Sequence, residues 1–394
     1  MNPGVLVPGG ARPASTWGSL RAFAEASLGS RREAAWLVDS VRDVPAEGRT
    51  ALVGGRESDP PTESQIRIVG DLVGRRISGE PLQYVLGKWQ FRGVELRVDR
   101  RALIPRPETE QVVEIALREL RRVAALGDGA CRNADGACRN AEGADKTDET
   151  EETGANRESE AAVHETTLHV VDLGTGSGAI ALSIVSEALL WAGWAEGTSL
   201  TLGDEAPQPL DLTVWGIDRS SDALDLAEDN RRCLADRFAR RIRLLQGEWW
   251  QALPSWLAGE LSVAIANPPY ISSDEMATLD PVVRDWEPRC ALEAGPAGTE
   301  AHQRILSDAP SWLKPGGAIV LEIAPHQAHD VVALAEAAGL GDVEVHCDLA
   351  GHERAVVARR EGAVVSRREG AVHAGRARVA DAHPEPRVAA RHEP

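Results

Sequence analysis

Apolar and polar residues follow two different periods along this chain. Near the N-terminus, three stretches carry apolar residues every three or four positions, which predicts helices, the first beginning after Ser15 or Thr16. The next stretch, "PLQYVLGKWQFRGVELRV", alternates around a central Arg-Gly and predicts a β-hairpin. These patterns place a helical domain at residues 15–82 and a hairpin linker at residues 83–104.

Farther along, short apolar runs alternate with helical segments. A helix is expected at residues 108–126, and five candidate strands follow: "LHVVDLG", "LTVWGID", "RIRLLQGE", "LSVAIAN" and "GGAIVLEIA". Strands that alternate with helices are typical of a doubly wound, mostly parallel α/β sheet. We place this α/β domain at residues 105–360.

Four segments lack such a pattern. Residues 127–165 contain the tandem repeat "GACRNAD" and "GACRNAE" and then an acidic run, and their low apolar content predicts a disordered insert. A second insert is expected at residues 191–211. Residues 1–14, rich in Pro and Gly, and residues 361–394 are expected to be a disordered N-terminus and tail.

Composition excludes several classes of function. The net charge of −18 argues against non-specific binding of nucleic acid by the whole surface. The five cysteines form no CxxC pair and no Cys/His cluster, so we expect free thiols and no metal site. No apolar run is long enough to span a membrane, and the N-terminus does not resemble a signal peptide. We therefore expect a cytoplasmic protein without membrane contact.

A glycine-rich loop joins the first predicted strand to a helix. It contains Gly174, Thr175, Gly176, Ser177 and Gly178. Glycines let a backbone approach a ligand closely at the strand-end crevice of an α/β sheet. The spacing differs from the dinucleotide fingerprint, and a tight turn without a ligand is the alternative.

Two further strand ends carry candidate cofactor ligands. Asp218, at the end of the second strand, can accept hydrogen bonds from both ribose hydroxyls of an adenosine; the alternative is a helix cap, which Ser220 or Ser221 can provide instead. After the third strand, Glu248 and Trp249 can face an adenine, although packing is a common role for such a tryptophan. The three strand ends together favour S-adenosylmethionine over NAD.

The fourth strand ends in Asn267, Pro268, Pro269 and Tyr270. The side-chain oxygen of Asn267 and the carbonyl of Pro268 can accept the N–H hydrogens of a planar amine or amide, and the two prolines hold them in one arrangement. Tyr270 offers a ring for stacking. These residues are the candidate catalytic and substrate-binding group, with a rigid strand-ending turn as the alternative.

This motif resembles that of methyltransferases acting on adenine N6, cytosine N4 or glutamine N5. Together with "GEPLQYVLGKWQFRGVEL", "LIPRPETE", "DLGTGSGAIALSI", "EPRCALEAG" and "DLAGHERAVVAR", the chain resembles the HemK/PrmC-type release-factor glutamine N5-methyltransferases. The resemblance covers roughly residues 15–125, 167–190 and 212–360. It implies a class I S-adenosylmethionine-dependent methyltransferase domain, preceded by a helical bundle that recognises the substrate and a linking hairpin.

The resemblance also implies the reaction partners and the site. The substrate is the glutamine of the Gly-Gly-Gln loop in bacterial class 1 peptide chain release factors. The glycine loop and Asp218 bind S-adenosylmethionine, Trp249 and Glu248 lie at the adenine, and Asn267 lies near the methionine end. The family usually has Asp where this chain has Glu248. In "IPRPETE", Arg106 and Glu110 are expected to line the site.

Three alternatives stay open from the residues. A DNA adenine-N6 methyltransferase needs a basic DNA-binding region, and the acidic chain predicts no direct, specific DNA binding. A ribosomal-protein glutamine methyltransferase shares the motif but carries a Pro-Arg-Ser type sequence where this chain has "IPRPETE". A regulator that binds S-adenosylmethionine without catalysis would not need Asn267.

Overall fold

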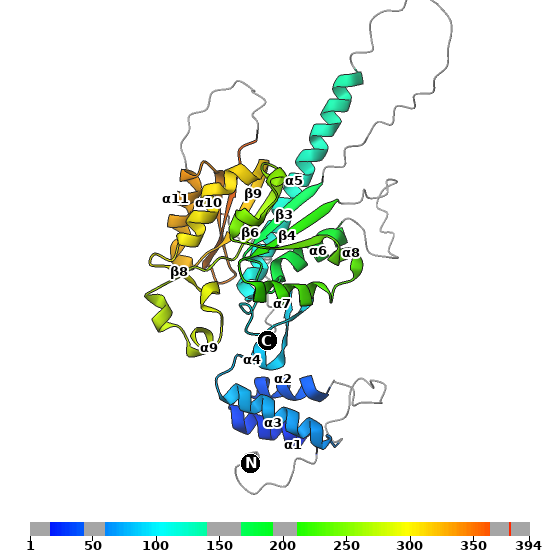
Figure 1. Cartoon of the computed structure of the whole chain (residues 1–394), viewed down its shortest axis with the longest axis vertical. Helices are drawn as coiled ribbons and strands as arrows, with labels where there is room; N and C mark the ends of the chain where they lie inside the picture. Colours follow the sequence, from blue (N-terminus) through cyan, green and yellow to red (C-terminus); the bar gives the residue numbers. More distant parts are fainter. Residues whose placement is uncertain (1–15, 43–59, 140–166, 192–210, 363–377, 380–394) are drawn as a thin grey trace, which may run out of the picture.

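The computed structural model describes residues 16–42, 60–139, 167–191, 211–362 and 378–379. A small group of helices lies at one end of the molecule, and a larger domain built around a central sheet forms the rest (Figure 1). The expected disordered N-terminus and most of the two inserts and the tail lie outside the described residues.

Three helices form the N-terminal unit: α1 (Trp17–Leu28), α2 (Arg31–Arg42) and α3 (Glu63–Ile77). Thr16 and Thr62 cap α1 and α3, each through a reciprocal capping box that satisfies free backbone N–H groups. The apolar faces of the three helices pack into a core of their own, which includes Leu20, Leu37 and Val69. Burial of these faces, spaced as the sequence pattern predicts, stabilises helices too short to be stable alone.

The segment expected to be entirely hairpin begins with a helix. α4 (Leu82–Leu86) precedes the strands β1 (Lys88–Phe91) and β2 (Val94–Arg97), so the prediction of a hairpin from residue 83 is wrong at its start. The helix forms because one turn lets Leu82 join the helical core while Tyr84 enters the core of the sheet domain. α4 therefore connects the two cores.

The hairpin turn uses two residues with positive φ. Arg92 has φ of 44° and Gly93 has φ of 78°, the pattern of a tight two-residue turn that matches the twist of the strands. The Arg92 guanidinium binds Glu187 at 2.5 Å and Glu114 at 2.7 Å, and these ion pairs attach the turn to the sheet domain.

The central sheet has eight strands in the order β12-β10-β11-β9-β6-β3-β4-β5. Seven of them run in the same direction, and β11 is antiparallel to both of its neighbours; all five strands expected from the sequence are present. The strands are β3 (Leu168–Leu173), β4 (Leu212–Asp218), β5 (Ile242–Gln246), β6 (Leu261–Ala266), β9 (Leu313–Glu322), β10 (Gly341–Cys347), β11 (Glu353–Arg359) and β12 (Arg378–Val379). The prediction of a doubly wound, mostly parallel sheet is confirmed.

Helices cover both faces of this sheet. One apolar core packs β3, β4 and β6 against α5 (Pro107–Arg139) and α6 (Ala179–Trp191); the other packs the opposite face against α10 (Glu300–Trp312) and α11 (Ala328–Ala337). α7 (Ser221–Arg231) lies beside β5 and β2. The remaining short elements are α8 (Asp236–Ala239), α9 (Pro281–Arg284), β7 (Ile271–Ser272), β8 (Glu293–Gly295), and the 3₁₀ turns η1 (Trp249–Ala252), η2 (Ser255–Leu257), η3 (Glu275–Thr278), η4 (Arg289–Ala291) and η5 (Pro325–Gln327).

Two segments expected to be disordered carry regular structure. α5 continues through Arg139, beyond the expected helix end at residue 126, and projects from the sheet domain (Figure 1). In the tail, β12 adds to the edge of the sheet by pairing with β10, because an edge strand leaves backbone groups free to pair.

Candidate active site

A cavity of about 330 Å3 lies at the carboxyl ends of β3, β4 and β6. The chain proceeds from β3 outward to β4 and β5 and then returns to β6 on the other side of β3, so the strand order reverses at this point. Parallel α/β sheets bind ligands at such a reversal. The cavity volume is within the range of small-molecule sites.

The glycine loop after β3 forms one wall of the cavity. Gly174 and Gly176 have φ of 78° and 55°, a conformation that other residues rarely adopt. The loop backbone is held by β4, because the N–H groups of Gly174 and Thr175 both donate to the carbonyl of Ile217 at 2.8 Å. Gly178 does not line the cavity; a Cβ there would overlap Leu182, so this glycine permits close packing of α6.

Asp172, in strand β3, holds the glycine loop by hydrogen bonds. Its Oδ2 accepts hydrogen bonds from the Thr175 hydroxyl at 2.6 Å and the Ala181 N–H at 3.2 Å, while its Oδ1 is buried without a partner among the described residues. Burial, together with the nearby charge of Asp218, raises the pKa of Asp172 to about 7, although its two hydrogen bonds act in the opposite direction. The sequence patterns did not single out this residue as functional.

Asp218 lies at the tip of β4, facing the glycine loop. Its carboxylate accepts from the Gly176 N–H and the Ser220 N–H, both at 2.9 Å. Ser220 itself caps α7, so the cap does not depend on Asp218. Burial raises the pKa of Asp218. Because each carboxylate oxygen has two lone pairs, Asp218 keeps acceptor capacity on the side of the cavity.

Glu248 and Trp249 line the same cavity beyond β5. The Glu248 carboxylate is partly exposed and binds Arg304 at 3.0 Å. Trp249 has φ of 50°, and its ring lies 3.6 Å from the position of a Cβ on Gly174. Its indole Nε1 is buried and has no partner among the described residues. The backbone strain and the position beside the glycine loop favour a role in the site beyond core packing.

The Asn-Pro-Pro-Tyr segment follows β6. Asn267 and Pro269 line the cavity, whereas Pro268 and Tyr270 do not. The Asn267 amide Nδ2 donates to the Thr109 hydroxyl at 3.0 Å, and no described residue donates to its Oδ1 or to the Pro268 carbonyl. The Tyr270 hydroxyl lies 3.5 Å from Glu322, and burial raises the pKa of Tyr270. The two expected acceptors are therefore free of protein donors among the residues that the structure describes.

The expectation that Arg106 and Glu110 line the cavity is wrong. Arg106 binds the buried carboxylate of Glu287 at 2.6 Å, and Glu287 also accepts from the Ile104 N–H at 3.1 Å. Glu110 instead contacts Arg92 at the hairpin turn. Thr109, between them, is the residue of "IPRPETE" that faces both the cavity and Asn267.

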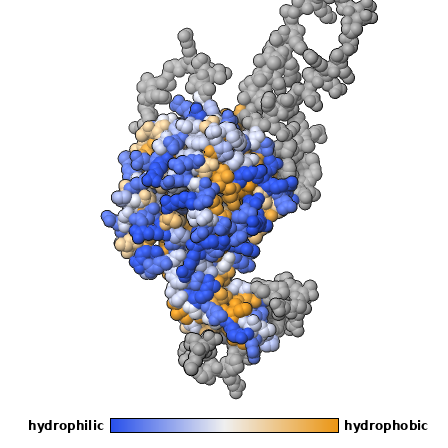
Figure 2. Space-filling model, viewed as in Figure 1, coloured by the Kyte–Doolittle hydropathy of each residue, from blue (hydrophilic) through white to orange (hydrophobic). Residues whose placement is uncertain are grey.

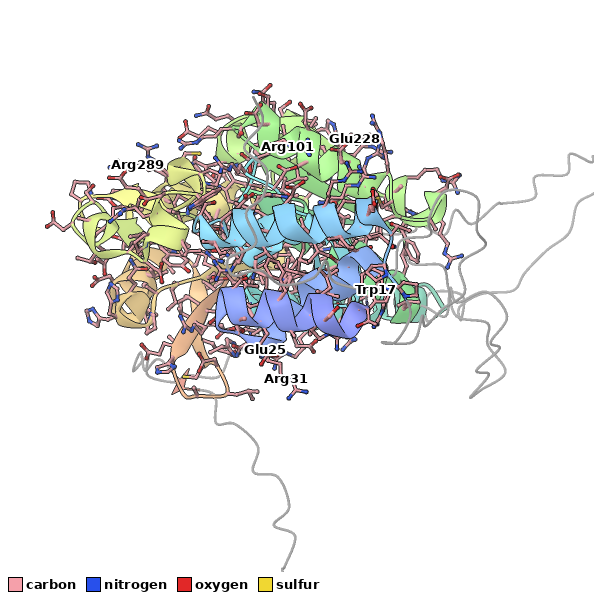
Figure 3. The ribbon with its side chains drawn as sticks, turned by 90° about the horizontal axis from the view of Figure 1, so that it is seen from below. Trp17, Glu25, Arg31, Arg101, Glu228 and Arg289 are labelled. Carbon is pink, nitrogen blue, oxygen red and sulfur yellow. The ribbon has the colours of Figure 1, made fainter. Side chains whose placement is uncertain are left out.

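The loop after β2 closes the cavity from the side of the helical unit. Arg101 lines the cavity and binds Asp99 at 2.8 Å and Asp229 of α7 at 3.0 Å. Figure 3 shows Arg101 beside Glu228, the neighbour of Asp229, and well apart from Arg289. Pro288 and Cys290, on either side of Arg289, also line the cavity, whereas Arg289 itself does not.

Within the described ranges, no group of three His, Cys, Asp or Glu side chains could hold a metal ion. None of the helices in those ranges is long and apolar enough to cross a membrane.

The sheet topology and the cavity beside its glycine loop define a class I methyltransferase. No family model matches the sequence. Proteins named release factor glutamine methyltransferase from several bacteria are similar to this chain. The one from Synechocystis sp. is 34% identical over 71% of this chain and 73% of its own length. Those from Burkholderia pseudomallei and Deinococcus radiodurans are 33% and 32% identical, over 78% and 79% of this chain and 85% and 86% of their own lengths.

The chain belongs to the release factor glutamine methyltransferase family. Among solved structures, a methyltransferase from Pyrococcus furiosus covers 50% of this chain and 77% of its own, with 15% identity and a TM-score of 0.32, a likeness too weak to support an inference.

The raised pKa of Asp172 predicts a pH-dependent stability. The folded state holds this proton up to about pH 7, whereas the unfolded chain releases it near 3.8. The contribution of Asp172 to the free energy of unfolding is therefore fully present at low pH and is lost as the pH rises to about 7. Urea unfolding of wild type and Asp172→Asn at several pH values should show wild type losing stability relative to the variant across this window. A difference that stays constant with pH would contradict the assignment.

Proposed function

We propose that this protein transfers a methyl group from S-adenosylmethionine to the side-chain amide nitrogen of the glutamine in the Gly-Gly-Gln loop of bacterial class 1 release factors. The observation that carries the proposal is the Asn267 carboxamide at the cavity, with its Nδ2 held by Thr109 and its Oδ1 free to accept. Family membership supports glutamine as the planar group. The reaction is proposed for the cytoplasm, where translation occurs.

We propose that S-adenosylmethionine occupies the cavity, held by the residues that the sequence indicates. Gly174 and Gly176 line the cavity, and Asp218 has acceptor capacity for ribose hydroxyls. Trp249 and Glu248 lie beyond β5, where we propose the adenine. In this arrangement Asn267 lies on the opposite side of the glycine loop, next to the methionine end. When bound, S-adenosylmethionine supplies a methyl group on a positively charged sulfur.

The proposed role of the protein is to hold a weak nucleophile. An amide nitrogen has a delocalised lone pair, and its attack on the methyl carbon places positive charge on the N–H group. Acceptors aimed at those hydrogens, the Asn267 Oδ1 and the Pro268 carbonyl, stabilise this charge. The C–N bond forms as the C–S bond breaks, and the N–H proton leaves to water afterwards, so no basic residue is needed. Pro269 and Tyr270 are proposed to complete the glutamine pocket.

The helical unit is proposed to recognise the release factor. Its surface carries Trp36, Ile68 and Ile77, with 37%, 45% and 62% of their surface exposed. Figure 2 shows hydrophobic residues reaching the surface at this end of the molecule. Exposed apolar side chains on one small domain favour contact with a protein. They do not favour duplex DNA, and the net charge of −18 argues further against the adenine-N6 alternative.

Mass spectrometry tests the proposal. Purified release factor is incubated with the enzyme and S-adenosylmethionine, and the Gly-Gly-Gln peptide is expected to gain one methyl group, about 14 Da. Ribosomal proteins and duplex DNA are offered in parallel reactions. Methyl transfer to either of these, with none to the release factor, would contradict the proposal.

A further inference from the structure

A fully buried carboxylate lies behind the Asn-Pro-Pro-Tyr segment without a role in the chemistry above. Glu322 ends β9, and 2% of its surface is exposed. Its Oε2 accepts from the Thr109 hydroxyl at 2.7 Å, and its Oε1 lies 3.5 Å from the Tyr270 hydroxyl. Its backbone carbonyl is 2.8 Å from the Nε2 of the buried His302, which holds the strand end in place.

The hydrogen atoms in this group can be counted. Thr109 has one hydroxyl hydrogen, and ionised Glu322 can only accept, so that hydrogen goes to Glu322. The Thr109 oxygen is then left with lone pairs alone and must receive a hydrogen from its other neighbour. Asn267 therefore turns its NH₂ group to Thr109, at 3.0 Å, and its oxygen toward the cavity.

We propose that Thr109 and Glu322 are positioning residues that set which end of the Asn267 carboxamide faces the substrate. The inference rests on the proposed function, because it matters only if Asn267 accepts hydrogens from the substrate amide. The reversed carboxamide would present an NH₂ group to the NH₂ group of the glutamine, and two donors would then meet. A wrongly turned Asn267 leaves the cofactor wall intact but removes an acceptor that acts in the transition state.

Burial of Thr109 and Glu322 strengthens the effect. Thr109 is 3% exposed and Glu322 is 2% exposed, so little water competes with their hydrogen bonds to each other and to Asn267. A buried polar group without its partner costs about 1–3 kcal/mol, so the correct orientation of Asn267 is favoured over the reversed one roughly 5- to 150-fold. The effect on the reaction is expected in kcat, because Thr109 and Glu322 act through Asn267.

The first test changes Thr109. Thr109→Val keeps the shape but has neither donor nor acceptor, and Thr109→Ser keeps both. Assays at a pH well above 7 keep Glu322 ionised, since burial raises its pKa to about 7. Thr109→Val removes the preference, so about half of the Asn267 carboxamides are reversed and kcat is expected to fall about 2-fold, with an unchanged dissociation constant for S-adenosylmethionine; Thr109→Ser is expected to retain wild-type kcat. Equal kcat values for the two variants would overturn the proposal.

The second test exchanges the direction of the hydrogen bond. Asn267→Asp has no N–H for Thr109, so its carboxylate meets the Thr109 lone pairs and kcat is expected to fall. Glu322→Met removes the acceptor and frees the Thr109 hydroxyl to donate to the introduced carboxylate, so the double variant Asn267→Asp/Glu322→Met is expected to exceed Asn267→Asp in kcat. Glu322→Met alone should lower kcat, because Thr109 can then donate to the Asn267 oxygen. A double variant no better than Asn267→Asp would overturn the proposal.

Failure of the proposed function has a different signature. If wild type does not methylate the release factor at all, the proposed function is wrong. If wild type methylates it and the Thr109 and Glu322 variants bind S-adenosylmethionine and turn over like wild type, the reaction stands and the positioning role is wrong.

Discussion

Asn267→Ala is expected to lower kcat for methyl transfer by about 10²- to 10³-fold, the typical effect of removing one group that stabilises transition-state charge. The Oδ1 of Asn267 has no donor among the described residues, so its loss removes an acceptor from the cavity without breaking a contact of that oxygen inside the protein. The lost contact with Thr109 involves the Nδ2 only. Methylation of the release factor, followed by mass spectrometry under single-turnover conditions, measures the effect.

Cofactor binding and a matched serine variant serve as controls. Calorimetry should give nearly the same dissociation constant for S-adenosylmethionine in Asn267→Ala as in wild type. Ser273→Ala, in the same segment but exposed and bonded only to Glu293 through its hydroxyl, should leave kcat unchanged. An Asn267→Ala enzyme with near-wild-type kcat would show that the carboxamide does not hold the substrate.

Asp218→Ala is expected to weaken S-adenosylmethionine binding by roughly 10- to 100-fold, because hydrogen bonds to a charged group contribute about 1.5–3 kcal/mol each. The variant loses the proposed contacts to the ribose hydroxyls. It also loses the bond from the Gly176 N–H, which fixes the glycine loop against β4. Isothermal titration calorimetry of the purified protein measures the change in the dissociation constant.

Two further variants test whether the loss of affinity comes from the acceptor oxygens of Asp218. Asp218→Asn retains one acceptor oxygen, and its affinity should lie between those of wild type and Asp218→Ala. Asp222→Ala removes an exposed carboxylate from the first turn of the neighbouring helix, outside the cavity lining, and should bind as wild type does. Unchanged affinity in Asp218→Ala would place the ribose elsewhere in the cavity.

Most of the fold could be predicted from local patterns in the sequence. The capping boxes at Thr16 and Thr62, the Arg-Gly turn of the hairpin and the apolar strand runs all depend on residues close together in the chain, and the helix starts, the turn and the strands could be predicted from them. The errors concern the boundaries of segments, which were placed from composition or periodicity alone. Residues from 127 were judged by their low apolar content, yet α5 continues through Arg139, so composition misplaced the end of the helix.

The candidate site, too, could be predicted from the sequence only in part. Nine of the fourteen residues expected to line the site do so, and these nine come from the strand ends that carry the glycine loop, the acids with Trp249, and the Asn-Pro-Pro-Tyr segment. Arg106 and Glu110, which were expected from "IPRPETE", do not. Gly178, Pro268 and Tyr270 follow the same strands but do not line it. The direction of a side chain at a turn depends on what packs around it, and the chain alone does not show that.

By itself, the sequence determined the order of strands and helices, the residues at the strand ends and the resemblance that names the family. Only the tertiary structure decided which distant side chains meet. Thr109 lies 158 residues from Asn267 and 213 from Glu322, and Arg106 lies 181 residues from Glu287. The two pairs of Thr109 form because helix α5 begins beside the carboxyl ends of β6 and β9, and the parallel register brings both strand ends to one edge. A carboxylate at the end of an apolar strand and a threonine between two acids were visible in the sequence, but their hydrogen bonds depend on that packing.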